Sequence, residues 1–175
     1  MRMKIKIRKE KPEDYSGIFT VNKIAFEQDN ESRLVDSLRQ SEYYIPGLSL
    51  VAEYEEKILG HILFTKLKIF DKSGTVHNSI SLAPMAVLPS YQNLGIGTEL
   101  VKSGLEKAAK LGFESVIVLG HDKYYPRFGF KPANKWEITC PFEVPDEVFM
   151  ALELVPGGLK NISGEVQYPK EFDDV

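Results

Sequence analysis

The segment from Met85 to Leu111 constrains the fold most, because it reads as strand, turn, glycine-containing loop and helix in direct succession. An apolar stripe at helical spacing predicts the helix from about Gly97 onward, and Gly112 is a suitable C-terminal stop. A short apolar strand is predicted next, at Ser115–Leu119. Since a helix crossover separates the two strands, we expect them to be parallel.

The preceding part of the chain predicts a strand, two helices and then more strands. Apolar and basic residues alternate over residues 3–8, which is typical of a strand with one buried face. The first helix is predicted to begin near Pro12, and Asn30 is predicted to cap the second. An antiparallel meander is expected over Leu48–Tyr54, Ile58–Ile69 and Ser79–Leu88. Pro84 cannot donate to a ladder, so it implies an edge, a bulge or a break in the last strand.

Length, composition and charge indicate one ordinary globular domain. The chain has 175 residues, and its formal net charge of −3 gives no reason to expect a nucleic-acid partner. No apolar run approaches the roughly 20 residues that cross a bilayer, and no signal peptide is recognisable. The single cysteine fits a reduced, cytoplasmic setting, and three scattered histidines give no metal-ligand pattern. We therefore expect a cytoplasmic protein without metal or membrane partner, as a monomer or homodimer.

The loop from Gln92 to Gly97 lies where the predicted helix begins. A helix N-terminus presents unpaired N–H groups and a partial positive charge, which suit a phosphate or diphosphate. Gly95 and Gly97 also lack the Cβ that would hold such a ligand off the backbone. The Rossmann fingerprint needs a third glycine where this chain has Leu100, and no P-loop pattern is present. The loop is therefore interpreted as a diphosphate site of a different kind.

This loop and its flanks resemble the acetyl-CoA motif of the GCN5-related N-acetyltransferase (GNAT) family. That motif is Gln or Arg, two residues, Gly, one residue, and Gly or Ala, and Gln92, Gly95 and Gly97 match it. Val87 and Pro89 stand where the family has a strand valine and a proline. The predicted N-terminal helices and the meander also have counterparts in the family.

The resemblance implies a fold, a domain and a set of cofactor contacts. The fold is the α+β GNAT fold, a mostly antiparallel twisted sheet with a parallel pair splayed around the cofactor and helices on its flanks. It covers about residues 3–155, which leaves residues 156–175 as an extension of a single N-acetyltransferase domain over residues 1–175. Acetyl-CoA is implied as the co-substrate, bound by Met85, Ala86, Val87, Gln92, Asn93, Leu94, Gly95, Ile96, Gly97, Thr98, Tyr124 and Phe128.

A tyrosine-rich segment carries a second signature. Family members often have Tyr, three residues and Gly-Phe after the fifth strand, and Tyr125 has that spacing to Gly129. The family's tyrosine is the usual general acid, so the resemblance implies this role for Tyr125. The stretches 119–130 and 159–169 are similar to those of the YhbS-like subgroup of bacterial acetyltransferases. The implied reaction is direct attack of a primary amine on acetyl-CoA in a ternary complex, with a backbone N–H near Val87 as the oxyanion donor.

The general base and the amine acceptor stay open. Many relatives place a glutamate on the fourth strand, but Ser79–Leu88 contains no acid. Glu27, Glu53, His61 or a water chain are the candidates for the base. A polyamine, an antibiotic, an amino acid, a peptide N-terminus or a protein lysine could be the acceptor. The sequence also leaves open two other functions: a non-catalytic acyl-CoA-binding or sensing module on the same scaffold, and an unrelated nucleotide-phosphate binder.

Overall fold

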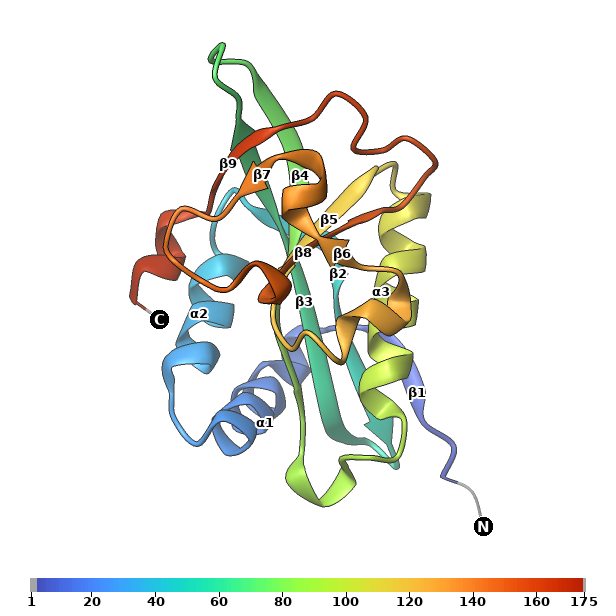
Figure 1. Ribbon diagram of the computed structural model, residues 1–175. Helices are drawn as coiled ribbons and strands as arrows, with labels where there is room; N and C mark the ends of the chain where they lie inside the picture. Colours follow the sequence, from blue (N-terminus) through green and yellow to red (C-terminus); the bar gives the residue numbers. More distant parts are fainter. Residues whose placement is uncertain (1–2, 175) are drawn as a thin grey trace. The chain divides into compact units, whose positions relative to one another are not determined.

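A computed structural model of the chain describes residues 3–174 and has the mixed α+β architecture expected from the sequence (Figure 1). The described residues form two compact units. Unit 1 contains residues 3–65, 83–107 and 170–174, and unit 2 contains residues 66–82 and 108–169. Strands β3 (Lys57–Phe70) and β4 (Val76–Val87) each contribute residues to both units.

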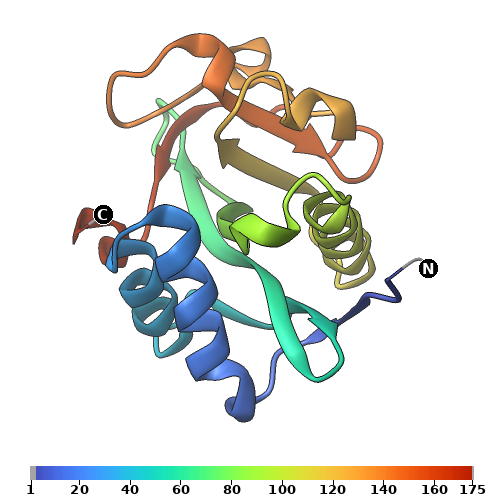
Figure 2. The same ribbon diagram turned by 90° about the horizontal axis from the view of Figure 1, so that it is seen from below.

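Unit 1 combines three antiparallel strands with the long helices. Its elements are β1 (Lys6–Lys9), a 3₁₀ turn at Pro12–Asp14, α1 (Tyr15–Phe26), α2 (Asn30–Arg39), β2 (Tyr44–Tyr54), the first part of β3, the last part of β4, a 3₁₀ turn at Pro89–Tyr91, most of α3 (Ile96–Lys110), and a 3₁₀ turn at Lys170–Asp174. Strand β2 pairs with β1 on one edge and with β3 on the other. Figure 2 shows α1 and α2 on one side of these strands and α3 on the other.

Local chemistry explains how these elements begin and end. The β2–β3 hairpin turns through Glu55 and Glu56, which both have positive φ, as a tight hairpin turn requires. Helix α2 is capped one residue earlier than predicted, because the Asp29 carbonyl accepts the hydrogen bond from Arg33 N–H at 2.9 Å. Gly112, at φ +94°, ends α3 as predicted, and its N–H donates to the Ala109 carbonyl at 3.0 Å.

A buried apolar cluster holds α1 and α2 against the strands of unit 1. Its members come from both helices and from two strands, and they are Ile18, Leu34, Val35, Leu38, Val51 and Leu63. Phe172, in the 3₁₀ turn at Lys170–Asp174, packs against the same cluster. On the other side of the sheet, the ring of Phe64 packs directly against Gly104 of α3. A Cβ at position 104 would lie 2.2 Å from this ring. The helices are therefore held by close packing on both faces of the strands.

Unit 2 contains the parallel pair that the helix crossover predicts. Strand β5 (Ser115–Leu119) has the predicted bounds and runs parallel to β4, from Ile80 opposite Val116 to Leu82 opposite Val118. The other elements are β6 (Lys131–Pro132), β7 (Ile138–Thr139), β8 (Phe149–Glu153), β9 (Gly164–Gln167), and 3₁₀ turns at Tyr125–Phe128, Ala133–Trp136 and Asp146–Val148. Strand β8 pairs with β5 and β6, while β9 pairs with the end of β3 and with β7. The short strands β6, β7 and β9 lie in segments for which the sequence predicts no strand.

Pro84 does not break β4, which continues to Val87. The pairing of β4 with β5 ends at Leu82, so Pro84 lies beyond the last residue pair of this ladder. A proline is tolerated there, because no β5 acceptor needs its missing N–H. Of the three alternatives that the sequence left open, the break is wrong and a strand edge toward β5 agrees with the structure.

Gly164 begins β9, which pairs with the end of β3, and its replacement tests the close contact between these strands. Its φ is +124°, and a Cβ would lie 2.0 Å from the Phe70 carbonyl oxygen. We expect Gly164→Ala to lower the free energy of unfolding by about 2–4 kcal/mol, measured by urea denaturation. Gly74→Ala is the matched control, because Gly74 has φ +85° but open space around its Cβ position. It should cost only about 1 kcal/mol, and equal losses would contradict the packing argument.

Candidate active site

The segment after β4 is tied to the strand by a side chain. A 3₁₀ turn covers Pro89–Tyr91, and Gln92 then returns to extended backbone. Its Nε2 atom donates a hydrogen bond of 3.0 Å to the carbonyl oxygen of Val87. Gln92 therefore links the loop to the last residue of β4 and fixes how the chain approaches α3.

The loop before α3 turns through two left-handed residues. Asn93 has φ +63° and Gly95 has φ +86°, and a Cβ on Gly95 would meet no atom within 4 Å. Gly95 is thus required for the backbone conformation, and the space beside it is open. The first hydrogen bond of α3 runs from Glu99 N–H to the Gly95 carbonyl at 3.1 Å. The N–H groups from Gly95 to Thr98 precede this ladder, and such groups at a helix N-terminus suit an anionic ligand.

The residues predicted to bind acetyl-CoA in unit 1 differ in how exposed they are. Gln92, Asn93, Leu94 and Gly95 are exposed, with Leu94 at 62% of its full area. Met85, Val87, Gly97 and Thr98 are half-buried. Ala86 and Ile96 are buried, so only their backbone groups are left to face a ligand. Gly60 on β3 was not predicted from the sequence, and a Cβ there would come 3.1 Å from the Ala86 carbonyl oxygen. Gly60 therefore allows β4 to lie close to β3 beside the predicted site.

In unit 2, Tyr125 begins the 3₁₀ turn that follows β5, and its ring is enclosed by aromatic neighbours. Tyr125 is only 7% exposed. Its ring meets those of Tyr124 and Phe130 edge to face, at centroid distances of 5.1 and 5.7 Å. Tyr124 also contacts Phe128 at 5.3 Å and carries the Arg127 guanidinium over its face at 4.6 Å. The rings of Tyr124 and Phe130 therefore fix the orientation of Tyr125.

A glycine that sequence reasoning did not single out makes room for this tyrosine. A Cβ at Gly120 would lie 2.5 Å from Cε2 of Tyr125, which is closer than real atoms approach. The position of Gly120 directly after an apolar strand was the available signal. Burial and the nearby Tyr124 raise the pKa of Tyr125 to about 12. The hydroxyl therefore stays protonated at neutral pH, as a proton donor must.

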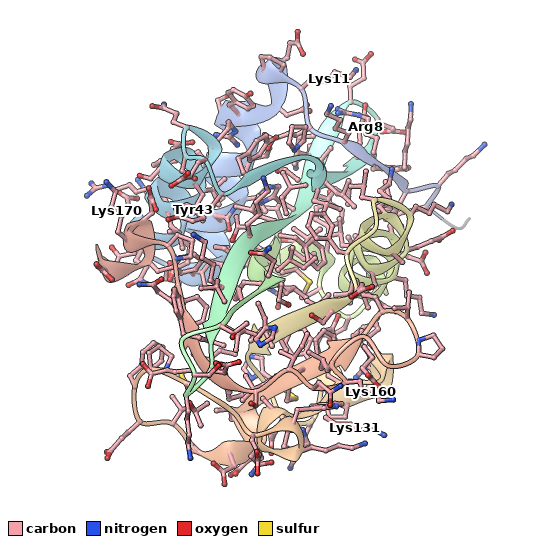
Figure 3. All side chains as sticks on the ribbon, turned by 90° about the horizontal axis from the view of Figure 1, so that it is seen from above. Arg8, Lys11, Tyr43, Lys131, Lys160 and Lys170 are labelled. Carbon is pink, nitrogen blue, oxygen red and sulfur yellow. The ribbon has the colours of Figure 1, made fainter. Side chains whose placement is uncertain are left out.

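Two of the candidates for the general base are engaged elsewhere in unit 1. Glu53 pairs with Arg8, which is labelled in Figure 3 and also donates two hydrogen bonds to Asp14. His61 is fully buried in β3, with Nε2 2.8 Å from Ser49 Oγ. Burial, helped by the charge of Arg39, lowers its pKa to about 3. A histidine so enclosed has no access to an amine, so it serves packing rather than proton transfer. Glu27 is exposed at the end of α1.

The buried His61 predicts a loss of stability in mild acid. Its pKa in the folded protein lies below the ordinary value of 6.5, so folding favours the neutral ring. This contribution is complete above about pH 6.5 and is lost as the pH falls toward the folded value. We expect about 2 kcal/mol less unfolding free energy at about pH 5, measured by urea denaturation across pH. His61→Gln should remove this part of the slope, and parallel pH profiles would contradict it.

Comparison with known proteins agrees with this geometry. Residues 13–130 match the model of the "Acetyltransferase (GNAT) family". Over 135 residues, which are 77% of this chain and 74% of the relative, the chain is 42% identical to the uncharacterised N-acetyltransferase YjhQ of Escherichia coli (strain K12). It is 30% identical to the uncharacterised N-acetyltransferase YhbS of the same strain over 167 residues, or 95% of this chain and 98% of the relative.

Solved structures give the same result. The crystal structure of Escherichia coli YhbS in complex with CoA superposes with a TM-score of 0.90 at 29% identity, covering 99% of this chain and 94% of that one. A GNAT acetyltransferase from Brucella melitensis in complex with acetyl-CoA has a TM-score of 0.80 at 32% identity, covering 98% and 100%. The chain belongs to the GNAT family of acetyltransferases. Within that family it is similar to YjhQ and YhbS, and the similarity to YhbS confirms the subgroup expected from residues 119–130 and 159–169.

Within residues 3–174, no group of three or more His, Cys, Asp or Glu residues is arranged to hold a metal ion. None of the helices in that range has the length and apolar character needed to span a membrane.

Proposed function

We propose that the chain transfers the acetyl group of acetyl-CoA to a primary amine by direct attack in a ternary complex. The observation that carries the proposal is the loop Gln92–Gly97 at the start of α3, with free N–H groups ahead of the helical ladder and open space at Gly95. Such a helix terminus fits a diphosphate. The relatives crystallised with CoA and acetyl-CoA support acetyl-CoA as the ligand here.

Binding at the loop would position the acetyl donor, and the loop itself would take no part in bond making or breaking. The N–H groups from Gly95 to Thr98 would hold the diphosphate, and the backbone of Met85–Val87 would hold the pantetheine arm. Acetyl-CoA supplies the activated thioester. Holding the thioester and the amine together can be worth about 7–11 kcal/mol, which is the largest share of the catalysis. A backbone N–H near Val87 would stabilise the developing oxyanion.

Tyr125 is the proposed general acid. The amine nitrogen forms a bond to the acetyl carbon, the carbon–sulfur bond breaks, and the departing thiolate takes the proton of the Tyr125 hydroxyl. The amine loses its own proton to solvent or to a base that is still unassigned. Support for Tyr125 comes from its spacing to Gly129, its locked ring and its raised pKa.

We further propose that units 1 and 2 act as one N-acetyltransferase domain over residues 1–175, with residues 156–175 as its extension. The family match supports this, because residues 13–130 include parts of both units.

Two measurements test the proposed function. Acetyl-CoA at a hundredfold excess over Kd should increase the free energy of unfolding by about 2.7 kcal/mol through mass action, and so raise the melting temperature. ATP and NAD should not. Release of CoA should then depend on an added primary amine. Equal stabilisation by ATP would instead indicate a nucleotide-phosphate binder.

A non-catalytic acyl-CoA sensor is the second candidate. The observations that favour it are the absence of an acid in Ser79–Leu88 and the burial of His61. A sensor would be stabilised by acetyl-CoA but would release no CoA with any amine of a broad panel. Amine-dependent release of CoA would exclude this candidate.

A further inference from the structure

Unit 2 contains a cavity of about 550 Å³ that the proposed mechanism does not use. Its walls come from the 3₁₀ turn at Ala133–Trp136, from β7, and from the segment that leads into β8. The apolar part includes Ile138 and Phe149, which are buried. The lining residues are Asn134, Ile138, Thr139, Cys140, Phe142, Glu143, Val144, Pro145, Asp146 and Phe149. The cavity thus has the size and apolar character of a small-molecule site.

The charge of this cavity has one sign. Glu143 and Asp146 are the charged residues of the lining, both are exposed, and the lining includes no Lys, Arg or His. Phe142 is 51% exposed, and its ring stacks on Tyr168 with a centroid distance of 6.2 Å and an angle of 23°. One face of the Phe142 ring is covered in this way. Carboxylates and an open aromatic face both attract cations, so the lining selects for a positively charged ligand with an apolar body.

The wall of the cavity is joined by backbone contacts to the residue that seats Tyr125. Leu119 of β5 is opposite Phe149 of β8 in the antiparallel ladder. The next N–H, of Gly120, donates a hydrogen bond of 2.9 Å to the Val148 carbonyl. Gly120 in turn lies against the ring of Tyr125. Gly120 therefore contacts both Tyr125 and Val148, the residue that precedes Phe149 of the cavity wall, all within unit 2.

We propose that this cavity binds the acceptor, and that the acceptor is a diamine or polyamine with an apolar stem. The inference rests on the proposed function, since an acceptor presupposes acetyl transfer. The attacking nitrogen must be a free amine, whereas a nitrogen held by Glu143 and Asp146 stays an ammonium. Recognition and reaction therefore need two different nitrogens in one molecule. Acceptors that end in a carboxylate, such as free amino acids, are repelled by the same two residues.

The chain provides its own reporter for this cavity. Cys140 lines it, is half-buried, and is the single cysteine of the sequence. Burial raises the pKa of its thiol, so alkylation is best followed in mildly alkaline buffer. The experiment measures the rate at which iodoacetamide alkylates Cys140 of the full chain, by intact mass. Saturating hexamethylenediamine should slow this rate about tenfold, hexylamine should slow it less, and hexanoate should have no effect.

Matched variants separate charge recognition from simple blockage. The double variant Glu143→Gln, Asp146→Asn should lose the protection by hexamethylenediamine and should raise its KM about tenfold. Glu147→Gln is the control, because Glu147 is exposed in the same segment but does not line the cavity. It should behave like the unmodified chain. Protection that is absent, that is equal with hexanoate, or that persists in the double variant would overturn the proposal.

Failure of this inference can be told apart from failure of the proposed function, because alkylation requires neither acetyl-CoA nor turnover. Acetylation of hexamethylenediamine without protection of Cys140 would overturn the role of the cavity and keep the acetyltransferase. Charge-dependent protection without acetylation would support a cation site in the cavity. It would contradict both the proposal that the bound amine is an acceptor and the proposed function.

Discussion

Tyr125→Phe is expected to lower kcat by about 10²–10⁴-fold while leaving the affinity for acetyl-CoA unchanged. The substitution removes only the hydroxyl, and the ring should stay in place between Tyr124, Phe130 and Gly120. The proton that the leaving thiolate needs would then have to come from water. Steady-state release of CoA gives kcat, and stabilisation by acetyl-CoA in thermal unfolding reports the affinity.

Tyr44→Phe is the control for this experiment. Tyr44 lies in unit 1, and burial likewise raises its pKa to about 12. Its variant should keep the kcat of the unmodified chain. The raised pKa of Tyr125 adds a second readout: the acid remains protonated well above pH 10, so its ionisation should cause no loss of kcat below that pH. Full turnover by Tyr125→Phe would remove Tyr125 from the role of acid.

Thr98→Asp should weaken acetyl-CoA binding by tenfold to a hundredfold, about 1.4–2.7 kcal/mol. Thr98 is the third residue of α3, so a carboxylate there would stand beside the N–H groups proposed to hold the diphosphate. The two negative groups would repel each other. The same carboxylate interacts favourably with the helix dipole, so the variant should unfold at an equal or higher temperature without ligand.

Thr98→Asn separates the charge from the change of shape. It has nearly the same size as the aspartate but no charge, and it should lose at most a few-fold in affinity. Titration of both variants with acetyl-CoA by calorimetry gives the comparison. If Thr98→Asp and Thr98→Asn bind acetyl-CoA equally well, the diphosphate does not lie at the start of α3.

The sequence predicts the elements whose pattern is local. Strand β5 has the expected bounds, and α3 begins one residue before the prediction. Both are long or strongly apolar segments between glycines, so their own residues determine them. Strands β6, β7 and β9 were not predicted, because each has two to four residues. Such strands exist only through a partner that lies far away in the sequence.

The candidate site shows the same division. The loop at Gln92 could be located from glycine spacing and helix chemistry, since both are local properties, while the roles of its residues stay predictions. The burial of His61 could not be read from its strand pattern, because it depends on residues of α1 and β2. The role of Gly120 was missed for the same reason. The ring of Tyr125 lies against Gly120 only because the turn after β5 brings it back onto this residue.

The position of Phe172 has a consequence for synthesis on the ribosome. This side chain packs against the cluster of Ile18, Leu34 and Leu63, yet it is made after all of unit 2. Unit 1 therefore lacks this contact while residues 66–169 are being translated. In a nascent chain, the part of the α1–α2 cluster that Phe172 contacts would stay uncovered throughout that time.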